Sequence, residues 1–249
     1  MNPIFELRNV SKSIRDQEGQ PSKRLFSNIT VEITRPERIA LIGASGQGKS
    51  TLLRLMALLD APDDGELRLD GKASRETDPR QWRMEAAYVA QQAVMLPGSI
   101  EDNLRTVSVL HGTLYNQELA ARLMEQLGLE YLDPGKQASD CSGGEKQRIS
   151  LIRTMLLQPR ILLLDEITAS LDVNSARRVE ELLTGWHSEE GGSYIWVTHD
   201  LEQAQRISDK VWVMSGGGLH EYPGESFFSV PIDMLAKQYI QPAEGSLPQ

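Results

Sequence analysis

Residues 43–50, Gly-Ala-Ser-Gly-Gln-Gly-Lys-Ser, have the types and spacing of a loop that holds phosphate groups. They match the pattern G-x-x-x-x-G-K-[ST], whose glycines let successive backbone N–H groups point at phosphate oxygens. In such a loop we expect Lys49 to reach the β- and γ-phosphates of a nucleotide and the Ser50 hydroxyl to ligate Mg²⁺. A chance glycine-rich turn is the alternative, and the Lys-Ser pair disfavours it. The candidate phosphate-binding residues are Gly43, Ala44, Ser45, Gly46, Gln47, Gly48, Lys49, Ser50 and Thr51.

Two acidic residues, Asp165 and Glu166, follow the apolar run 161–164. The run is typical of a buried strand, and the tip of such a strand is where an open α/β sheet binds ligands. We expect Asp165 to hold Mg²⁺ through water and Glu166 to act as general base on the attacking water. Taken alone, the two acids could equally end a strand in solvent. The phosphate loop favours the catalytic interpretation.

The two groups need a sheet to bring them together, and the sequence predicts one. Strands are expected at 4–14, 29–34, 39–42, 66–71, 87–90, 161–164 and 194–197. Helices are expected at 51–59, 116–132 and 145–157, and on the face formed by Val179, Leu182, Leu183 and Trp186. Alternation of strands and helices over most of the chain favours an α/β fold.

Length and composition limit the function classes. The chain has 249 residues, 40% of them hydrophobic, a net charge of −9 and one cysteine. A chain of this size can bury a sizeable core, and its composition excludes disordered, collagen-like and disulfide-stapled classes. The acidic balance disfavours nucleic acid as a partner, and it disfavours a direct lipid anchor based on charge.

The sequence also predicts a location. No apolar run approaches the ~20 residues that span a bilayer, and the first residues lack the basic and apolar regions of a signal peptide. A single cysteine, Cys141, fits a reducing compartment. We therefore expect a cytoplasmic protein that reaches a membrane only through another chain.

Residues 141–148, Cys-Ser-Gly-Gly-Glu-Lys-Gln-Arg, resemble the signature motif of ABC ATPases, Leu-Ser-Gly-Gly-Gln followed by Gln-Arg. Gln91 stands where that family has its Q-loop, residues 170–172 where it has its D-loop, and His199 where it has its switch histidine. The resemblance covers residues 4–215. It implies an α/β P-loop NTPase of ABC type, with a mostly parallel core sheet, an antiparallel β subdomain and an inserted helical subdomain.

The resemblance also implies how the motifs act. Two copies of the chain would hold two ATP molecules head to tail, with Lys49 and Ser50 from one copy. The signature residues that reach the ATP of the partner subunit would be Ser142, Gly143, Gly144 and Glu145, with Asp172 in the D-loop. The catalytic residues would be Glu166, His199 at the γ-phosphate, and Gln91. The Mg²⁺ ligands would be Ser50, Gln91 and Asp165.

Each family motif also has a simpler interpretation. Ser142-x-x-Glu145 is by itself a helix capping box, and we expect it to be that as well. His199 taken alone would more often be structural, and a loop glutamine such as Gln91 would more often be solvated. Their order along the chain favours the functional interpretation.

The resemblance divides the single 1–249 domain into parts. Residues 1–91 and 159–215 would form the nucleotide-binding core and residues 92–158 the helical subdomain. Residues 216–249 are expected to be a variable tail, with Phe227 and Phe228 anchoring it back. The implied partner is an integral membrane permease at the inner face of the cell membrane. Residues 95–100 are the candidate for part of its groove.

The sequence departs from the family pattern in three places. Ile14 stands where many relatives stack an aromatic ring on adenine, which would weaken nucleotide affinity by at most about tenfold. Cys141 replaces the usual leucine, and residues 167–169 replace Pro-Thr-Ser. A helix start lowers a thiol pKa and apolar burial raises it. We expect a maleimide that reacts with Cys141 to inhibit hydrolysis, and we expect saturating ATP to protect against that inhibition.

The motif residues most resemble the ATP-binding subunit of a bacterial iron-export transporter, so iron export is the specific expectation. An importer of phosphate or an amino acid is the alternative within transport. A soluble ABC ATPase acting on ribosomes or DNA is the alternative outside it, but such proteins usually carry two ATPase halves or a long coiled coil. Only 50 residues separate Gln91 from Ser142. The presence of intact Lys49, Asp165, Glu166 and His199 disfavours a regulator without catalysis.

Overall fold

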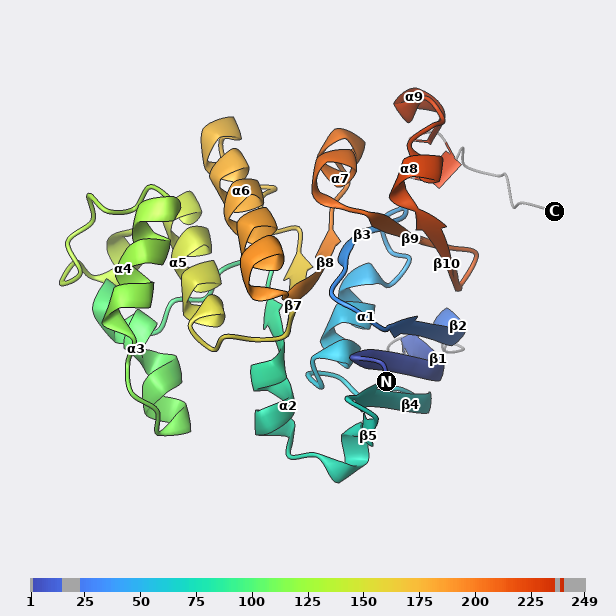
Figure 1. Ribbon diagram of the computed structural model, residues 1–249, viewed down its shortest axis with the longest axis horizontal. Helices are drawn as coiled ribbons and strands as arrows, with labels where there is room; N and C mark the ends of the chain where they lie inside the picture. The colour runs from blue at the N-terminus through green and yellow to red at the C-terminus, as the bar shows by residue number, and fades with distance from the viewer. Residues whose placement is uncertain (1, 15–22, 236–237, 240–249) are drawn as a thin grey trace.

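The computed structural model describes residues 2–14, 23–235 and 238–239 (Figure 1). The strands of this part of the chain are β1 (Phe5–Ile14), β2 (Lys23–Ile33), β3 (Arg38–Ile42), β4 (Asp64–Leu69), β5 (Lys72–Ala73), β6 (Ala86–Val89), β7 (Ile161–Asp165), β8 (Ser193–Val197), β9 (Lys210–Ser215) and β10 (Gly218–Pro223). The helices are α1 (Lys49–Met56), α2 (Pro79–Glu85), α3 (Ile100–His111), α4 (Gln117–Gln126), α5 (Gly143–Met155), α6 (Val173–Glu190), α7 (Leu201–Ile207), α8 (Gly224–Phe227) and α9 (Ile232–Leu235). Short 3-10 turns cover Ser74–Glu76 and Ala138–Asp140.

The central sheet has six strands in the order β10-β9-β3-β8-β7-β6. All neighbours from β9 to β6 run parallel, and β10 is antiparallel to β9. This mostly parallel sheet confirms the predicted α/β class. The apolar runs in β7 and β8 are buried on both faces, as expected for strands covered by helices.

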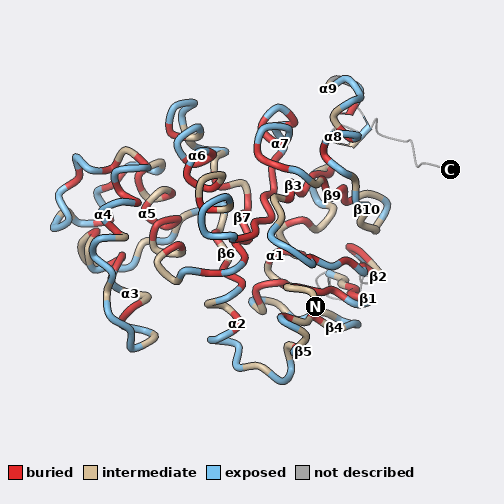
Figure 2. Tube along the Cα trace, in the orientation of Figure 1, coloured by how far each residue is buried: buried red, intermediate tan, exposed pale blue. Residues whose placement is uncertain are grey.

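Helix α1 lies between the two sheets of the molecule. Its buried residues Leu52, Leu53, Leu55 and Met56 share one core with the odd-numbered residues of β3 and β7, such as Leu41 and Leu163. The even-numbered residues of β7, with Tyr194 and Trp196 of β8, face a second core under α3, α4, α5 and α6. Figure 2 shows the resulting buried centre along β3, β7 and β8. The phosphate loop is therefore carried by a strand and a helix that are both fixed in the core.

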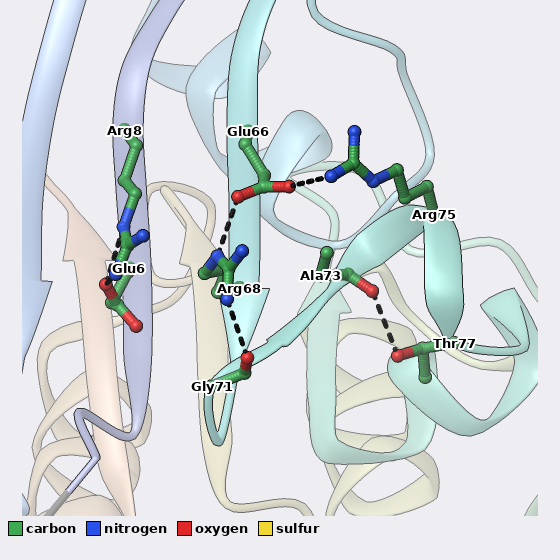
Figure 3. A network of polar contacts seen from close by, with 8 residues as sticks. All are labelled: Glu6, Arg8, Glu66, Arg68, Gly71, Ala73, Arg75 and Thr77. Carbon is green, nitrogen blue, oxygen red and sulfur yellow. Dashed lines mark hydrogen bonds and ion pairs between the residues drawn. The ribbon is translucent and has the colours of Figure 1, made fainter.

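A second sheet, β2-β1-β4-β5, is antiparallel and has one polar face. Leu7 of β1 pairs with Leu67 of β4 in the core, while Glu6 pairs with Arg68 on the opposite face of the sheet. Figure 3 shows this face, where Arg68 Nε donates to Glu66 Oε2 at 2.6 Å. Partly solvent-accessible ion pairs such as this one contribute little stability, so the buried apolar face fixes the sheet against α1. The antiparallel β subdomain is thereby confirmed.

Helices α3, α4 and α5 form the inserted helical part, on the left of Figure 1 and far from β1 and β2. The predicted stripe of Leu123, Met124 and Leu127 is buried there as core packing, with Leu119 partly buried. The predicted helix 116–132 is shorter than expected, since α4 ends at Gln126 and Gly128 takes a left-handed φ of 64°. Similarly, α1 ends at Met56, before Leu58 with a φ of 51°.

Beyond residue 215, the chain continues the central sheet. Strand β10 pairs with β9 from Gly218 to Pro223, so ordered structure extends past the expected start of the tail. Phe227 is buried at 5% exposure and Phe228 packs partly buried beside it, as expected for the anchor. Residues 236–237 and 240–249 of the expected tail lie outside the described residues. Among the helices that are described, none has the length and apolar character needed to cross a bilayer.

Candidate active site

The phosphate loop connects β3 to α1 with a backbone that requires glycine. Gly43 has a φ of 149°, and a Cβ at this position would lie 2.5 Å from the carbonyl oxygen of Met214 on β9. Gly48 has a φ of 96° and precedes the first residue of α1, where an added Cβ would lie 3.0 Å from the ring of Phe26. The loop therefore wraps closely around the start of α1, whose first N–H groups have no partner within the helix. This is the geometry of an anion-binding helix start.

Lys49 is held by the loop itself. Its Nζ donates to the carbonyl oxygens of Gly43 at 2.7 Å and Ala44 at 3.0 Å, and the residue is only 5% exposed. Burial lowers the pKa of Lys49, while the carboxylates of Glu166 and Asp165 oppose that shift. The ammonium group therefore lies between the loop and two acids, and a phosphate would have to replace loop carbonyls as its partner.

The two residues expected at Mg²⁺, Ser50 and Asp165, are in direct contact. Ser50 Oγ donates to Asp165 Oδ1 at 2.9 Å, although the residues are 115 positions apart. Asp165 ends β7 and is 3% exposed. Among the described residues, no cluster of three or more His, Cys, Asp or Glu side chains could hold a metal. A hydroxyl with one carboxylate is a hard oxygen donor set, of the kind Mg²⁺ uses when phosphates and water complete its coordination.

Sequence reasoning missed Tyr88. Its hydroxyl donates to Asp165 Oδ2 at 2.8 Å, from the neighbouring strand β6. Burial raises the pKa of Tyr88 well above its usual range, and the negative charge of Asp165 raises it further. The strand 87–90 was predicted, but only the alignment of β6 with β7 brings this side chain to Asp165.

Glu166 contacts both of the residues that the family resemblance links to catalysis. His199 Nε2 lies 2.7 Å from Glu166 Oε1, and Gln91 Nε2 donates to Glu166 Oε2 at 2.9 Å. Glu166 has a left-handed φ of 48°, which is a strained conformation for a residue with a side chain. The turn directs the chain away from β7 immediately after Asp165. Gln91 contacts Glu166 rather than Ser50 or Asp165, its expected co-ligands.

Strand register explains why these residues meet. Val89 of β6 pairs with Leu164 of β7, Asp165 of β7 pairs with Val197 of β8, and Val197 also pairs with Leu41 of β3. The carboxyl ends of four parallel strands therefore share one edge, which is the ligand-binding edge of an open α/β sheet. Gln91, Glu166, His199 and the phosphate loop all follow these strand ends.

A cavity of about 350 Å³ lies at this edge. It is lined by Ile14, Leu25, Ser45, Gly46, Gly48, Lys49, Ser50, Thr51, Gln91, Glu166 and His199. Its volume is within the range of small-molecule sites. Ile14 is 48% exposed at the end of β1 and supplies an apolar wall. Gly43, Ala44 and Gln47 belong to the same loop but are not part of this lining.

The signature residues lie elsewhere, at the start of α5. Ser142 is the N-cap: its Oγ accepts from the Glu145 N–H at 3.2 Å, and Glu145 Oε2 accepts from the Ser142 N–H at 2.6 Å. The predicted capping box is therefore present. Glu145 Oε1 also accepts from the Tyr131 hydroxyl at 2.7 Å. Hydrogen bonds from the Ser142 N–H and from Tyr131 lower the pKa of Glu145.

None of the four signature residues lines the cavity at the phosphate loop. Gly143 instead lines a separate hollow of about 410 Å³, together with Gln91 and Ser170. Gln91 borders both hollows. Asp172 of the expected D-loop caps α6, accepting from the Asn174 and Ser175 N–H groups at 3.0 Å each. A single copy of the chain therefore keeps the signature apart from its own phosphate loop.

A buried glutamine joins the two regions. Gln147 of α5 is 3% exposed, and its Nε2 donates to the carbonyl oxygen of Ala90 at 2.9 Å. Ala90 directly precedes Gln91, so α5 is tied to the segment that leaves β6. Cys141, by contrast, is buried next to the start of α5, and burial raises the pKa of its thiol.

A family model described as ABC transporter matches residues 26–169, more than half of the chain. The chain belongs to the ABC transporter family. It is an ATP-binding ATPase domain with the P-loop fold of that family, as the sequence motifs predicted.

Comparisons with individual proteins agree. The chain is 42% identical over 241 residues to a Bacillus subtilis protein described as an ABC transporter ATP-binding protein, YjkB, covering 96% of this chain and 94% of that one. It is 32% identical over 210 residues to an Escherichia coli protein described as "Probable iron export ATP-binding protein FetA", covering 84% of this chain and 90% of that one. Other similar ABC proteins are described as import ATP-binding proteins for phosphate, methionine or spermidine and putrescine.

Among solved structures, the dimeric post-hydrolysis state of the ATP-binding cassette MJ0796 bound to ADP and Pi resembles this ABC domain. Its TM-score is 0.78 at 25% sequence identity, covering 88% of this chain and 98% of that one. The similarity extends over nearly the whole cassette and supports the ABC fold.

Proposed function

We propose that this ABC domain is the ATP-hydrolysing subunit of a membrane transporter, and that the cavity beside the phosphate loop is its nucleotide site. One observation carries the proposal: Lys49, Ser50, Gln91, Glu166 and His199 come from four strand ends and line one cavity of about 350 Å³. The loop N–H groups and the start of α1 would bind the phosphates. Ile14 would contact the adenine as an aliphatic wall, without the stacking that an aromatic ring provides.

Ser50 and Asp165 fit Mg²⁺, because a buried carboxylate and a hydroxyl 2.9 Å apart are suitable oxygen ligands. When bound, Mg²⁺ would neutralise charge on the β- and γ-phosphates. Ser50 would ligate it directly and Asp165 would hold one of its waters. Gln91 would join them after it releases Glu166, its present partner.

Glu166 is placed to act as general base. An oxygen of its carboxylate would accept a proton from the attacking water, whose oxygen bonds to the γ-phosphorus as the bond to the β–γ bridging oxygen breaks. His199, now 2.7 Å from Glu166, would hold the γ-phosphate. Lys49 would stabilise the charge on the transferred phosphoryl group after it leaves the carbonyls of Gly43 and Ala44.

The second half of each site would come from another copy of the chain. Ser142, Gly143, Gly144 and Glu145 would meet the ATP of the partner subunit, with Asp172 at the same interface. Two facts support this: these residues lie outside the cavity at their own phosphate loop, and the similar cassette MJ0796 forms a dimer. The start of α5 leaves its first N–H groups available for phosphate oxygens.

The transporter partner would be an integral membrane permease at the inner face of the cell membrane, which would place this cytoplasmic chain at the membrane without a lipid anchor. Val94, next to the proposed groove segment 95–100, and Leu96, within it, are exposed apolar residues. Iron export is the specific substrate proposal, supported by the similarity to FetA. Import of phosphate or an amino acid is the second candidate, supported by the import proteins among the relatives.

The nucleotide site is tested by removing the lysine that faces the phosphates. Lys49→Ala should lose binding of a fluorescent ATP analogue and hydrolysis together, because no other side-chain ammonium lines the cavity among the described residues. Lys72→Ala, at an exposed position of β5, is the matched control and should behave as wild type. Unchanged binding by Lys49→Ala would contradict the proposal.

The transport role is tested in cells. The chain expressed without any candidate permease should remain in the soluble fraction, and it should move to the membrane fraction when its permease is co-expressed. Membrane vesicles containing both proteins would then be assayed for ATP-dependent movement of iron and of phosphate. Membrane association in the absence of every permease would contradict the proposed partner.

A further inference from the structure

A tyrosine hydroxyl holds one oxygen of the carboxylate that the proposed function places beside Mg²⁺. Tyr88 donates to Asp165 Oδ2 at 2.8 Å, and Ser50 donates to Asp165 Oδ1 at 2.9 Å. Since an ionised carboxylate only accepts hydrogen bonds, the Tyr88 hydroxyl must direct its proton to Oδ2. The two donors approach different oxygens, so together they fix the rotation of the carboxylate plane.

The sheet builds this contact from the backbone upward. Tyr88 of β6 pairs with Leu163 of β7, and Asp165 is two residues further along on the same face. Diagonal neighbours on paired strands are within reach of an aromatic side chain. The tyrosine ring also packs partly buried against the core around α1. The ring is therefore held by packing, and its hydroxyl arrives at Asp165 without further adjustment.

Packing alone does not account for the hydroxyl. A phenylalanine ring would fill the same space against α1, but it would leave Asp165 Oδ2 without this donor. Asp165 is 3% exposed, so water has little access to replace the lost hydrogen bond. The oxygen atom of Tyr88 therefore acts on Asp165 in a way that its ring does not.

We propose that Tyr88 is a positioning residue of the metal site, which occupies Oδ2 of Asp165 so that Oδ1, beside Ser50, faces the cation and its waters. This inference rests on the proposed function, in which Ser50 and Asp165 hold Mg²⁺. Residues that hydrogen-bond to metal-holding side chains orient them, and their loss typically weakens metal affinity or activity by about 10–100-fold. Asp165 would act through water, so the lower end of that range applies here.

The experiment compares Tyr88→Phe with Tyr194→Phe. Tyr194 lies in the same sheet, is fully buried, and donates its hydroxyl to the carbonyl of Ile207 on the opposite side from α1. Binding of a fluorescent ATP analogue is measured in EDTA and then during titration with Mg²⁺. Tyr88→Phe should keep its affinity in EDTA but need about tenfold more Mg²⁺ for half-maximal enhancement. Tyr194→Phe should match wild type in both measurements.

The outcomes separate this inference from the proposed function. An unchanged Mg²⁺ requirement in Tyr88→Phe overturns the role of Tyr88. A loss of affinity for the ATP analogue in EDTA as large as the loss with Mg²⁺ also overturns it, because the hydroxyl would then support the phosphate loop rather than the metal site. Asp165→Asn is measured alongside. If Asp165→Asn keeps the normal Mg²⁺ response, the proposed metal site itself fails. Thermal unfolding of each variant without nucleotide verifies that the fold is retained.

Discussion

The edge of the central sheet and the start of α5 are both rich in polar groups, but they are built in different ways. At the sheet edge, the contacting residues are far apart in sequence: 115 positions separate Ser50 from Asp165, and 75 separate Gln91 from Glu166. At α5, Ser142 and Glu145 are three positions apart and bond to each other reciprocally. The first arrangement depends on the register of four strands, whereas the second depends on one helix start.

The two regions also differ in how many existing hydrogen bonds a ligand must break in order to bind. At the sheet edge, Lys49 bonds to loop carbonyls and Glu166 bonds to Gln91 and His199, so a nucleotide must exchange existing contacts for new ones. At α5, the side chains of Ser142 and Glu145 already have hydrogen-bond partners in the capping box. The first backbone N–H groups of the helix remain available to another molecule. We infer that the sheet edge carries the chemistry, while the start of α5 responds to the nucleotide of a second subunit.

The largest expected effect is on Glu166. Glu166→Gln keeps the shape and hydrogen-bonding capacity of the side chain but removes the basic carboxylate, so hydrolysis should slow at least about a hundredfold. Binding of ATP should survive, because it depends on the loop, Lys49 and Ser50. Unhydrolysed ATP should also shift the variant towards dimer. Single-turnover hydrolysis and size-exclusion chromatography with ATP measure both effects.

Glu181→Gln is the matched control, since Glu181 is an exposed acid in the middle of α6. It should hydrolyse ATP at the wild-type rate and show no added dimer. Near-normal turnover in Glu166→Gln would mean that the base is another group and that the sheet edge has been misinterpreted.

The difference between the regions also explains what the sequence could predict. The phosphate loop and the capping box are local patterns, and both were predicted with their residues. The acids at the end of β7, Asp165 and Glu166, were predicted from an apolar run and its end. Gln91 and His199 came only from the family resemblance, because no local pattern distinguishes them from solvated or structural residues.

Contacts that depend on strand register could not be predicted. Tyr88 reaches Asp165 only because β6 lies beside β7 with Val89 opposite Leu164. Strand β10 was missed because its sequence, Gly218–Pro223, is half exposed and lacks a buried apolar pattern. The early end of α4 was missed because an apolar stripe continues past Gly128 to Leu129, although the helix does not.

The next largest effect concerns the hydrogen bond that joins α5 to the segment after β6. Gln147→Leu removes the donor to the partly buried carbonyl of Ala90, and leaving that carbonyl without a partner costs about 1–3 kcal/mol. The free energy of unfolding in urea should fall by that amount while ATP binding persists. Gln126→Leu, at an exposed position of α4, should have little effect. Equal stability of the two variants would show that Gln147 does not join α5 to β6.

A smaller stability effect distinguishes capping from nucleotide recognition at α5. Ser142→Ala removes the N-cap and should cost about 1 kcal/mol, which lowers Tm by about 2–4 °C. It should also weaken ATP-driven dimerisation, measured in the Glu166→Gln background, without weakening binding of ATP to one copy. The second change is expected because the Ser142 hydroxyl would meet the nucleotide of the partner subunit.

The chain contains its own control for this experiment. Ser99 caps α3 in an equivalent capping box with Asp102. Ser99→Ala should therefore lose similar stability and keep ATP-driven dimerisation. If the two variants dimerise equally well, the start of α5 acts only as a helix cap and the composite site is wrong.

The smallest expected effect concerns Cys141, which lies just before the start of α5. A helix start favours the thiolate and burial disfavours it. Cys141 is 5% exposed, and its pKa is raised, chiefly by burial, so burial is the stronger influence here. The maleimide that is expected to inhibit hydrolysis should therefore label the native chain slowly at neutral pH, and faster when urea unfolds it. Because Cys141 is the only cysteine, mass spectrometry of the labelled chain reports on this position alone.

Addition of ATP and Mg²⁺ to Glu166→Gln should slow labelling further, since the dimer would cover the start of α5. Labelling as fast as that of a small exposed thiol, with or without ATP, would show that the start of α5 is open and unprotected by a second subunit.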